Sequence, residues 1–143
     1  MPAAIILFAH GAREPEWARP FEDIRDRVRA SGARVELAFL EIMSPSLDDA
    51  AARLAQEGCR AVTIVPLFLA QGGHVKRELP QMAEELRRRH AGCEFTVTPP
   101  LGDIPEVIAA IAAWLQRAAD SAAPKKKSQR SPRDCSAPRI PRR

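Results

Sequence analysis

Two of the three histidines in this 143-residue chain follow long apolar segments. His10 comes directly after the segment 3–9, and His74 stands a few residues beyond the segment 61–70. If both segments are strands of a parallel sheet, both histidines lie near the carboxyl ends of strands, where open sheets bind ligands. A neutral imidazole can ligate a divalent ion and can also accept a proton. The pair therefore predicts a site that handles a metal ion, protons or both.

Glycines and basic residues beside these histidines are predicted to bind the substrate. Glycine has no side chain, so the backbone can approach a flat ligand closely. Basic side chains would form a positive rim that attracts a polyanion, and solvated surface charge is the alternative interpretation. The predicted substrate contacts are Gly11, Arg13, Gly72, Gly73 and Lys76, and Arg77 fits either interpretation.

Glu41 is the acidic candidate at the same edge of the sheet, because it follows the apolar segment 35–40. Its carboxylate has three possible roles: a third metal ligand, a proton acceptor, or a cap of the turn before Pro45. The third histidine, His90, follows three arginines at a predicted helix end, where exposure is expected. We therefore do not expect His90 to be a ligand.

Three functions remain open on the residues alone. The first is an enzyme that moves a metal and protons, with His10, His74 and Glu41 as catalytic residues. The second is a protein that carries a metal or a flat ligand without catalysis. The third is a phosphotransferase with a histidine at a strand end. Dinucleotide, nucleotide-triphosphate and serine-hydrolase functions lack their usual motifs, since the chain has no G-x-G-x-x-G, P-loop or G-x-S-x-G.

Apolar segments that suit buried parallel strands alternate with helical patterns along the chain. The predicted strands are Ala3–Ala9, Val35–Leu40, Ala61–Leu69 and Phe95–Thr98. Strict alternation with short connections predicts an α/β fold, a doubly wound four-stranded parallel sheet flanked by helices. The strand order 2-1-3-4 would place the first and third strands side by side. His10 and His74 would then face one another across one crevice.

Four helices are predicted between and after these strands. The first begins near Glu16 and ends before Gly32, and the second begins after Ser46 as N-cap and stops at Gly58. The third covers about Leu79–His90, with Pro80 in its first turn. The fourth covers about Pro105–Ala119 and is expected to turn its apolar side inward. The residues of that side are Val107, Ile108, Ile111, Trp114 and Leu115.

Charge and composition divide the chain at residue 120. Residues 121–143 carry eight of the 22 Lys and Arg and one of the 18 acids, a net charge of +7, which leaves −3 on residues 1–120. The second segment is rich in Ala, Pro, Ser, Lys and Arg, so it cannot bury enough apolar surface to fold. We predict one domain at 1–120 and a disordered basic tail at 121–143. Since the basic charge belongs to the tail, no specific nucleic-acid partner is expected.

The remaining composition is that of a reduced, soluble protein. Three distant cysteines form no C-x-x-C pair, which favours structural thiols. No apolar stretch reaches the roughly 18 residues of a membrane-spanning helix. The first residues run directly into an apolar segment without a basic leader, so a cytoplasmic location and no membrane partner are expected.

The motifs in their order along the chain resemble those of one family, the small class II chelatases. These are the short sirohydrochlorin cobaltochelatases and ferrochelatases of the CbiX and SirB type. The likeness covers residues 3–117 and lies in the motifs His10-Gly11-Ala12-Arg13-Glu14-Pro15, Phe39-Leu40-Glu41, Pro66-Leu67-Phe68-Leu69, Gly72-Gly73-His74-Val75 and Leu79-Pro80.

The resemblance implies insertion of a divalent metal into a carboxylate-rich tetrapyrrole without ATP, in cobalamin or siroheme biosynthesis. Two pyrrole protons would be released. By position, His10 and His74 match the family's metal-binding and proton-accepting histidines, and Glu41 matches its strand-end acid. No cofactor is implied beyond the metal substrate, Co²⁺, Fe²⁺ or Ni²⁺.

Two further expectations follow from the resemblance. Larger family members look like two such lobes joined, so a homodimer would supply the second wall for the macrocycle. The family usually has Ser where this chain has Ala12, and often Asp where it has Glu14 and Glu78. The missing hydroxyl removes one substrate hydrogen bond and leaves the histidines unchanged.

Overall fold

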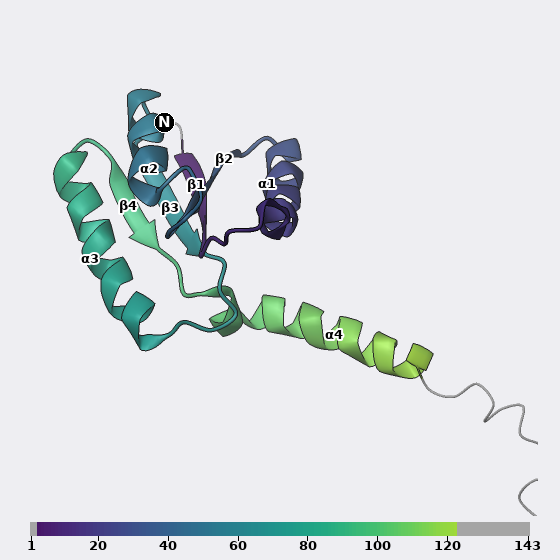
Figure 1. Cartoon of the computed structure of the whole chain (residues 1–143). Helices are drawn as coiled ribbons and strands as arrows, with labels where there is room; N and C mark the ends of the chain where they lie inside the picture. The colour runs from purple at the N-terminus through teal and green to yellow at the C-terminus, as the bar shows by residue number, and fades with distance from the viewer. Residues whose placement is uncertain (1–2, 123–143) are drawn as a thin grey trace, which may run out of the picture. The chain divides into compact units, whose positions relative to one another are not determined.

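The computed structural model describes residues 3–122 and contains one sheet of four parallel strands (Figure 1). The strands are β1 (Ala3–Ala9), β2 (Arg34–Phe39), β3 (Ala61–Pro66) and β4 (Glu94–Val97). Their order in the sheet is β2-β1-β3-β4, and all three pairings are parallel. The predicted fold class and strand order are therefore confirmed. The carboxyl ends of β1, β2 and β3 meet at one edge, where the candidate residues follow.

Helices cover both faces of this sheet, as the near-continuous burial of β1 and β2 requires. On one face lie the 3₁₀ turn η1 (Pro15–Ala18) and helix α1 (Arg19–Ala30), and on the other lie α2 (Leu47–Gln56) and α3 (Gly73–Arg89) (Figure 1). The two cores meet at β1, whose Leu7 packs toward α1 and whose Ile6 and Phe8 pack toward α2 and α3. With apolar contacts on both faces, β1 is held rigidly beneath His10.

The second helix begins and ends as predicted. The hydroxyl of Ser46 accepts a hydrogen bond from the backbone N–H of Asp49 at 3.1 Å, which caps α2. Gly58 follows the helix with a φ of +90°, a conformation that suits glycine. The backbone of Glu41 to Ser46 is thereby joined to the start of a buried helix.

The third unit differs from the prediction at both of its ends. Strand β3 ends at Pro66 rather than Leu69, and α3 begins at Gly73 rather than Leu79. Pro80 therefore lies inside the helix, not in its first turn. The cost of an interior proline is met by tertiary packing, because three α3 side chains are buried in the core. These are Leu79, Ala83 and Leu86.

Helix α4 (Pro105–Ala122) extends three residues beyond its predicted end. The described residues divide into two units, one ending at Ile108 and the other beginning at Ala109, so the division falls within α4. The predicted inward packing of α4 stays a prediction, because three of the five residues of its apolar side belong to the second unit. A helical period shows which residues share a side of a helix, but not what covers that side.

The predicted domain of residues 1–120 ends close to the last described residue. Residues 123–143, most of the predicted basic tail, lie outside the described residues. Across residues 3–122, no helix combines the length and apolar character needed to cross a membrane. The predicted cytoplasmic location stays a prediction.

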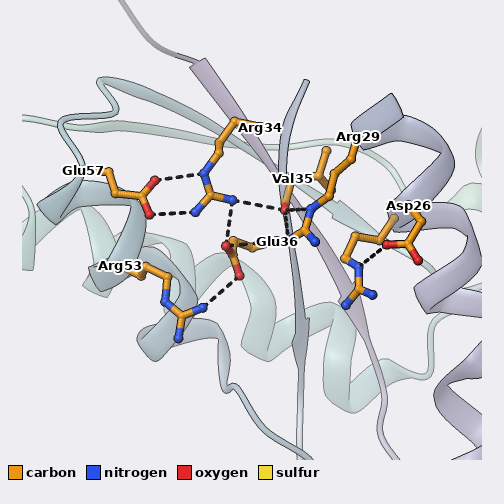
Figure 2. A network of polar contacts seen from close by, with 8 residues as sticks. Asp26, Arg29, Arg34, Val35, Glu36, Arg53 and Glu57 are labelled. Atoms are coloured by element: carbon orange, nitrogen blue, oxygen red, sulfur yellow. Dashed lines mark hydrogen bonds and ion pairs between the residues drawn. The ribbon is translucent and has the colours of Figure 1, made fainter. Parts of the chain in front are cut away.

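On each outer strand of the sheet, an arginine side chain donates hydrogen bonds to a backbone carbonyl. The guanidinium of Arg29 donates two hydrogen bonds to the carbonyl oxygen of Val35 in β2, at 3.1 and 2.9 Å (Figure 2). Arg87 donates two in the same way to the carbonyl of Phe95 in β4, at 3.0 and 2.8 Å. Backbone acceptors at both edges are thus satisfied by side chains rather than by another strand.

A buried carboxylate on β2 is compensated by further arginines (Figure 2). Glu36 is 6% exposed, and its oxygens lie 2.7 Å from Arg34 and 3.4 Å from Arg53 of α2. Burying a carboxylate without cationic partners would cost several kcal/mol. Arg34 also donates two hydrogen bonds to Glu57, at 2.9 and 2.8 Å, so β2 is tied to the end of α2.

The Arg34–Glu57 pair is expected to make stability depend on acid pH. The hydrogen bond from Arg34 holds the pKa of the Glu57 carboxyl below its ordinary value of 4.5. The pair therefore contributes fully above that ordinary value, and its contribution is lost as the pH falls through the lowered pKa. Urea unfolding should show Glu57→Gln less stable than the parent near pH 7, with the difference shrinking below about pH 4. A difference that grows on acidification would contradict this assignment.

Candidate active site

His10 and Glu41 are brought together by the adjacent strands β1 and β2. The two strands pair in register up to Ala9 and Phe39, and backbone bonds continue this ladder past both ends. Leu40 donates to the carbonyl of Ala9 at 2.8 Å, and Glu41 donates to the carbonyl of His10 at 3.1 Å. The side chains then lie with Nε2 of His10 3.6 Å from Oε2 of Glu41, each about half exposed. An imidazole and a carboxylate at this separation can share a cation or a proton.

Gly11 permits this arrangement through its own backbone. Its φ is +101°, and a Cβ at this position would overlap the carbonyl oxygen of Glu41. The close approach that the sequence predicted toward a flat ligand is made here toward Glu41. Ile42 then has a φ of +69°, and Met43 donates to the carbonyl of Glu41 at 2.7 Å, so a tight turn follows the acid. Contact between Gly11 and a substrate stays a prediction.

Phe68 is a neighbour of His10 that the sequence analysis did not identify. Its ring stands edge-on to His10, with centroids 6.5 Å apart, and edge-on to the buried Phe8 at 6.1 Å. Gly102 holds this segment, because its N–H donates to the carbonyl of Phe68 at 3.2 Å. A Cβ on Gly102 would overlap the carbonyl oxygen of Leu69. The predicted strand 61–69 included Phe68. In the structure this strand ends three residues earlier, so Phe68 lies in the segment after it.

His74 lies in the first turn of α3, not in the loop that the sequence predicted. Gly72 is the N-cap in an extended conformation, so both glycines of the motif are used at the start of a helix. One turn later, Oε2 of Glu78 lies 3.0 Å from Nε2 of His74. Glu78 was not among the predicted site residues. The spacing of four residues would have identified it if residue 74 had been placed in a helix.

The basic residues next to His74 lie on two sides of α3. A helix turns about 100° per residue, so Lys76 projects away from His74 while Arg77 shares its side. Lys76 lines a cavity of about 480 Å³ between α3 and the segment after β4. Nη1 of Arg77 lies 3.3 Å from the position that a Cβ on Gly73 would take. The helix therefore favours Arg77 over Lys76 as the basic residue beside His74, and Arg13 lies exposed in the loop after β1.

The structure thus contains two imidazole–carboxylate pairs on different elements. His10 and Glu41 lie at the strand ends, and His74 and Glu78 lie on α3. Within residues 3–122, no three His, Cys, Asp or Glu side chains gather closely enough to hold a metal ion. The side chains of the two pairs are between 43% and 74% exposed. That His10 and His74 share one crevice stays a prediction.

Comparisons with known proteins agree on one family. A family model described as CbiX matches residues 4–118. The sirohydrochlorin cobaltochelatase of Sulfurisphaera tokodaii is 33% identical over 107 residues, which cover 75% of this chain and 85% of that protein. The solved structure of the CbiX protein from Marinobacter aquaeolei is 32% identical with a TM-score of 0.76, over 85% of this chain and 100% of that chain.

A longer relative shares the fold. SirB from Bacillus subtilis, solved in complex with cobalt, is 22% identical with a TM-score of 0.70, over 82% of this chain. The match covers 51% of the SirB chain, so the described fold corresponds to about half of that protein. Because the CbiX model spans residues 4–118 and the Sulfurisphaera relative is 33% identical over most of its length, this chain belongs to the CbiX family.

Proposed function

We propose that this protein inserts a divalent metal, Co²⁺ or Fe²⁺, into sirohydrochlorin without ATP and releases two pyrrole protons. The observation that carries the proposal is the His10–Glu41 pair, which places an imidazole and a carboxylate at 3.6 Å on the ligand-binding edge of the sheet. Relatives that match this chain are named sirohydrochlorin cobaltochelatases, which supports the same substrate. His10, His74 and Glu41 are the proposed catalytic residues.

Metal insertion requires groups that bind a cation weakly and accept protons. The incoming metal carries two positive charges, and the ring must lose two N–H protons to bind it with overall charge balance. A neutral imidazole can be a ligand before transfer and a base during it. Both proposed histidines are substantially exposed, and Glu41 adds a negative charge that attracts the cation. A bound macrocycle would exclude water and strengthen these interactions.

Charged side chains around the pairs suit a substrate with many carboxylates. Arg13 and Arg77 are exposed and lie close in sequence to His10 and His74. Guanidinium groups can bind carboxylates through two parallel hydrogen bonds. Lys76 extends the same charge toward the neighbouring cavity. We infer that Arg13 and Arg77 hold substrate carboxylates, while Lys76 contributes to attraction at longer range.

A second copy of the chain is part of this proposal. One four-stranded lobe offers one wall to a flat macrocycle, and the SirB chain is about twice as long as the region matched here. Helix α4 carries apolar residues along one side, which suits association. Light scattering on the purified protein tests the proposal: a homodimer is expected, and a monomer that metallates at the full rate would overturn it.

The function is tested by following the absorbance of sirohydrochlorin with purified protein and Co²⁺, Fe²⁺ or Ni²⁺ in separate reactions. We expect metallation faster than the spontaneous reaction with at least one of the first two metals, and no effect of ATP. The matched control is the same reaction without protein at each metal concentration. Stoichiometric binding of sirohydrochlorin with no acceleration would overturn the proposal and select the carrier protein instead.

A further inference from the structure

Glu78 contacts His74 more closely than Glu41 contacts His10. The distance from Oε2 of Glu78 to Nε2 of His74 is 3.0 Å, a close ion-pair contact, whereas the Glu41–His10 distance is 3.6 Å. His74 and Glu78 are four residues apart on α3, so the helix itself sets their contact. The pair therefore forms without help from the strand ends.

A carboxylate beside one ring nitrogen determines which nitrogen remains available. A neutral imidazole carries hydrogen on one nitrogen and a lone pair on the other. Glu78 can only accept when ionised, so the hydrogen is favoured on Nε2 of His74, and Nδ1 keeps its lone pair. Metal-ligating histidines commonly donate their second N–H to a carboxylate, which fixes the ring and makes it a stronger ligand.

We propose that Glu78 is a positioning residue that holds His74 in the Nε2–H tautomer, so that Nδ1 is presented to the metal substrate. The inference rests on the proposed function, since it assigns His74 to that metal. It also assigns different roles to the carboxylates of the His10–Glu41 and His74–Glu78 pairs. Glu41 comes from a different strand than His10 and is free to contact the metal itself, whereas Glu78 acts through the ring of His74.

Two neighbouring observations fit this role. The His74 side chain is 74% exposed and Glu78 is 43% exposed, so the ring reaches outward while its partner lies nearer the helix. Arg77, which shares the His74 side of α3, lies against the backbone at Gly73. An arginine there is placed to meet a substrate carboxylate beside the metal ligand. The first two turns of α3 then carry a ligand, its positioning group and a substrate anchor.

The test compares Glu78→Ala and Glu78→Asp with the parent protein. Glu85→Ala is the matched control, because it removes the same charge from the same helix where Glu85 pairs only with Arg88 and Arg89 among the described residues. The first readout is the ¹⁵N NMR spectrum of the His74 ring in the metal-free protein at about pH 8.5, where imidazole is ordinarily neutral. We expect Nε2–H in the parent and in Glu85→Ala, and a mixture of tautomers in Glu78→Ala.

The second readout is the binding of Co²⁺ alone, followed by its visible absorption, together with metallation kinetics. Glu78→Ala should weaken Co²⁺ binding and raise the KM for the metal by about 10- to 100-fold. The KM for sirohydrochlorin should stay near the parent value, and Glu78→Asp should recover most of the loss. A purely structural role of Glu78 would not produce this selective change.

The outcomes separate the two proposals. If the parent does not metallate sirohydrochlorin, the proposed function fails, and the NMR and Co²⁺ measurements still decide the role of Glu78. If the parent shows Nδ1–H at His74, or if Glu78→Ala binds Co²⁺ as well as Glu85→Ala does, the positioning role is overturned. Selective loss in Glu78→Ala with recovery in Glu78→Asp supports it.

Discussion

Replacing His10 with alanine is expected to lower kcat/KM for sirohydrochlorin metallation by about 100- to 10,000-fold. The substitution removes a metal ligand and a proton acceptor together, and leaves Glu41 without its imidazole partner at 3.6 Å. Stability should change little, because the His10 side chain is about half exposed and lies outside the buried core. Absorbance-monitored metallation and urea unfolding measure the two effects separately.

The matched control is His90→Gln, which changes a histidine at the far end of α3 next to Phe95. This variant should metallate at the parental rate, since His90 is remote in sequence from both candidate pairs. If His10→Ala retains the parental rate above the spontaneous background, the assignment of His10 is wrong. A loss of rate that follows a loss of fold would appear in the unfolding curve.

Replacing Gly11 with alanine should produce a large loss of stability. A side chain at a φ of +101° costs about 1–2 kcal/mol. The new Cβ would in addition overlap the carbonyl oxygen of Glu41, so the segment after β2 must move. We expect a loss of about 3 kcal/mol or more in the free energy of unfolding, and loss of metallation because Glu41 leaves its place.

Two other glycines separate the cost of a positive φ from the cost of the contact with Glu41. Gly32 has nearly the same φ, +99°, but nothing within 4 Å of an added Cβ, so Gly32→Ala should show only the backbone cost. Gly92 has an open position without a positive φ, and Gly92→Ala should be nearly neutral. Equal losses for Gly11→Ala and Gly32→Ala in urea unfolding would show that the contact with Glu41 does not constrain the site.

The sheet was predictable from the sequence because buried parallel strands leave long apolar segments. The segment around Ile64 is apolar on both faces, and polar or glycine residues follow each segment where the chain turns. The positions of His10 and Glu41 followed directly, since adjacent parallel strands end at one edge. The strand order placed both residues at one edge, and the structure adds their contact at 3.6 Å, which was not predicted.

The start of α3 was not predictable, because local signals and tertiary packing disagree there. Gly72, Gly73 and Pro80 all have low helix propensity, and they suggested a loop that ends at residue 79. The buried Leu79 and Leu86 stabilise a helix that begins six residues earlier. The same error concealed Glu78, whose relation to His74 exists only on a helix.

The guanidinium groups on Val35 and Phe95 limit how two copies of this chain can associate. Two lobes that joined β2 to β2, or β4 to β4, would form one continuous eight-stranded sheet through new backbone hydrogen bonds. Arg29 and Arg87 already use a carbonyl on each of those strands, so such a merged sheet would have to displace charged donors first. The charged donors on both outer strands therefore oppose lateral growth of the sheet into filaments.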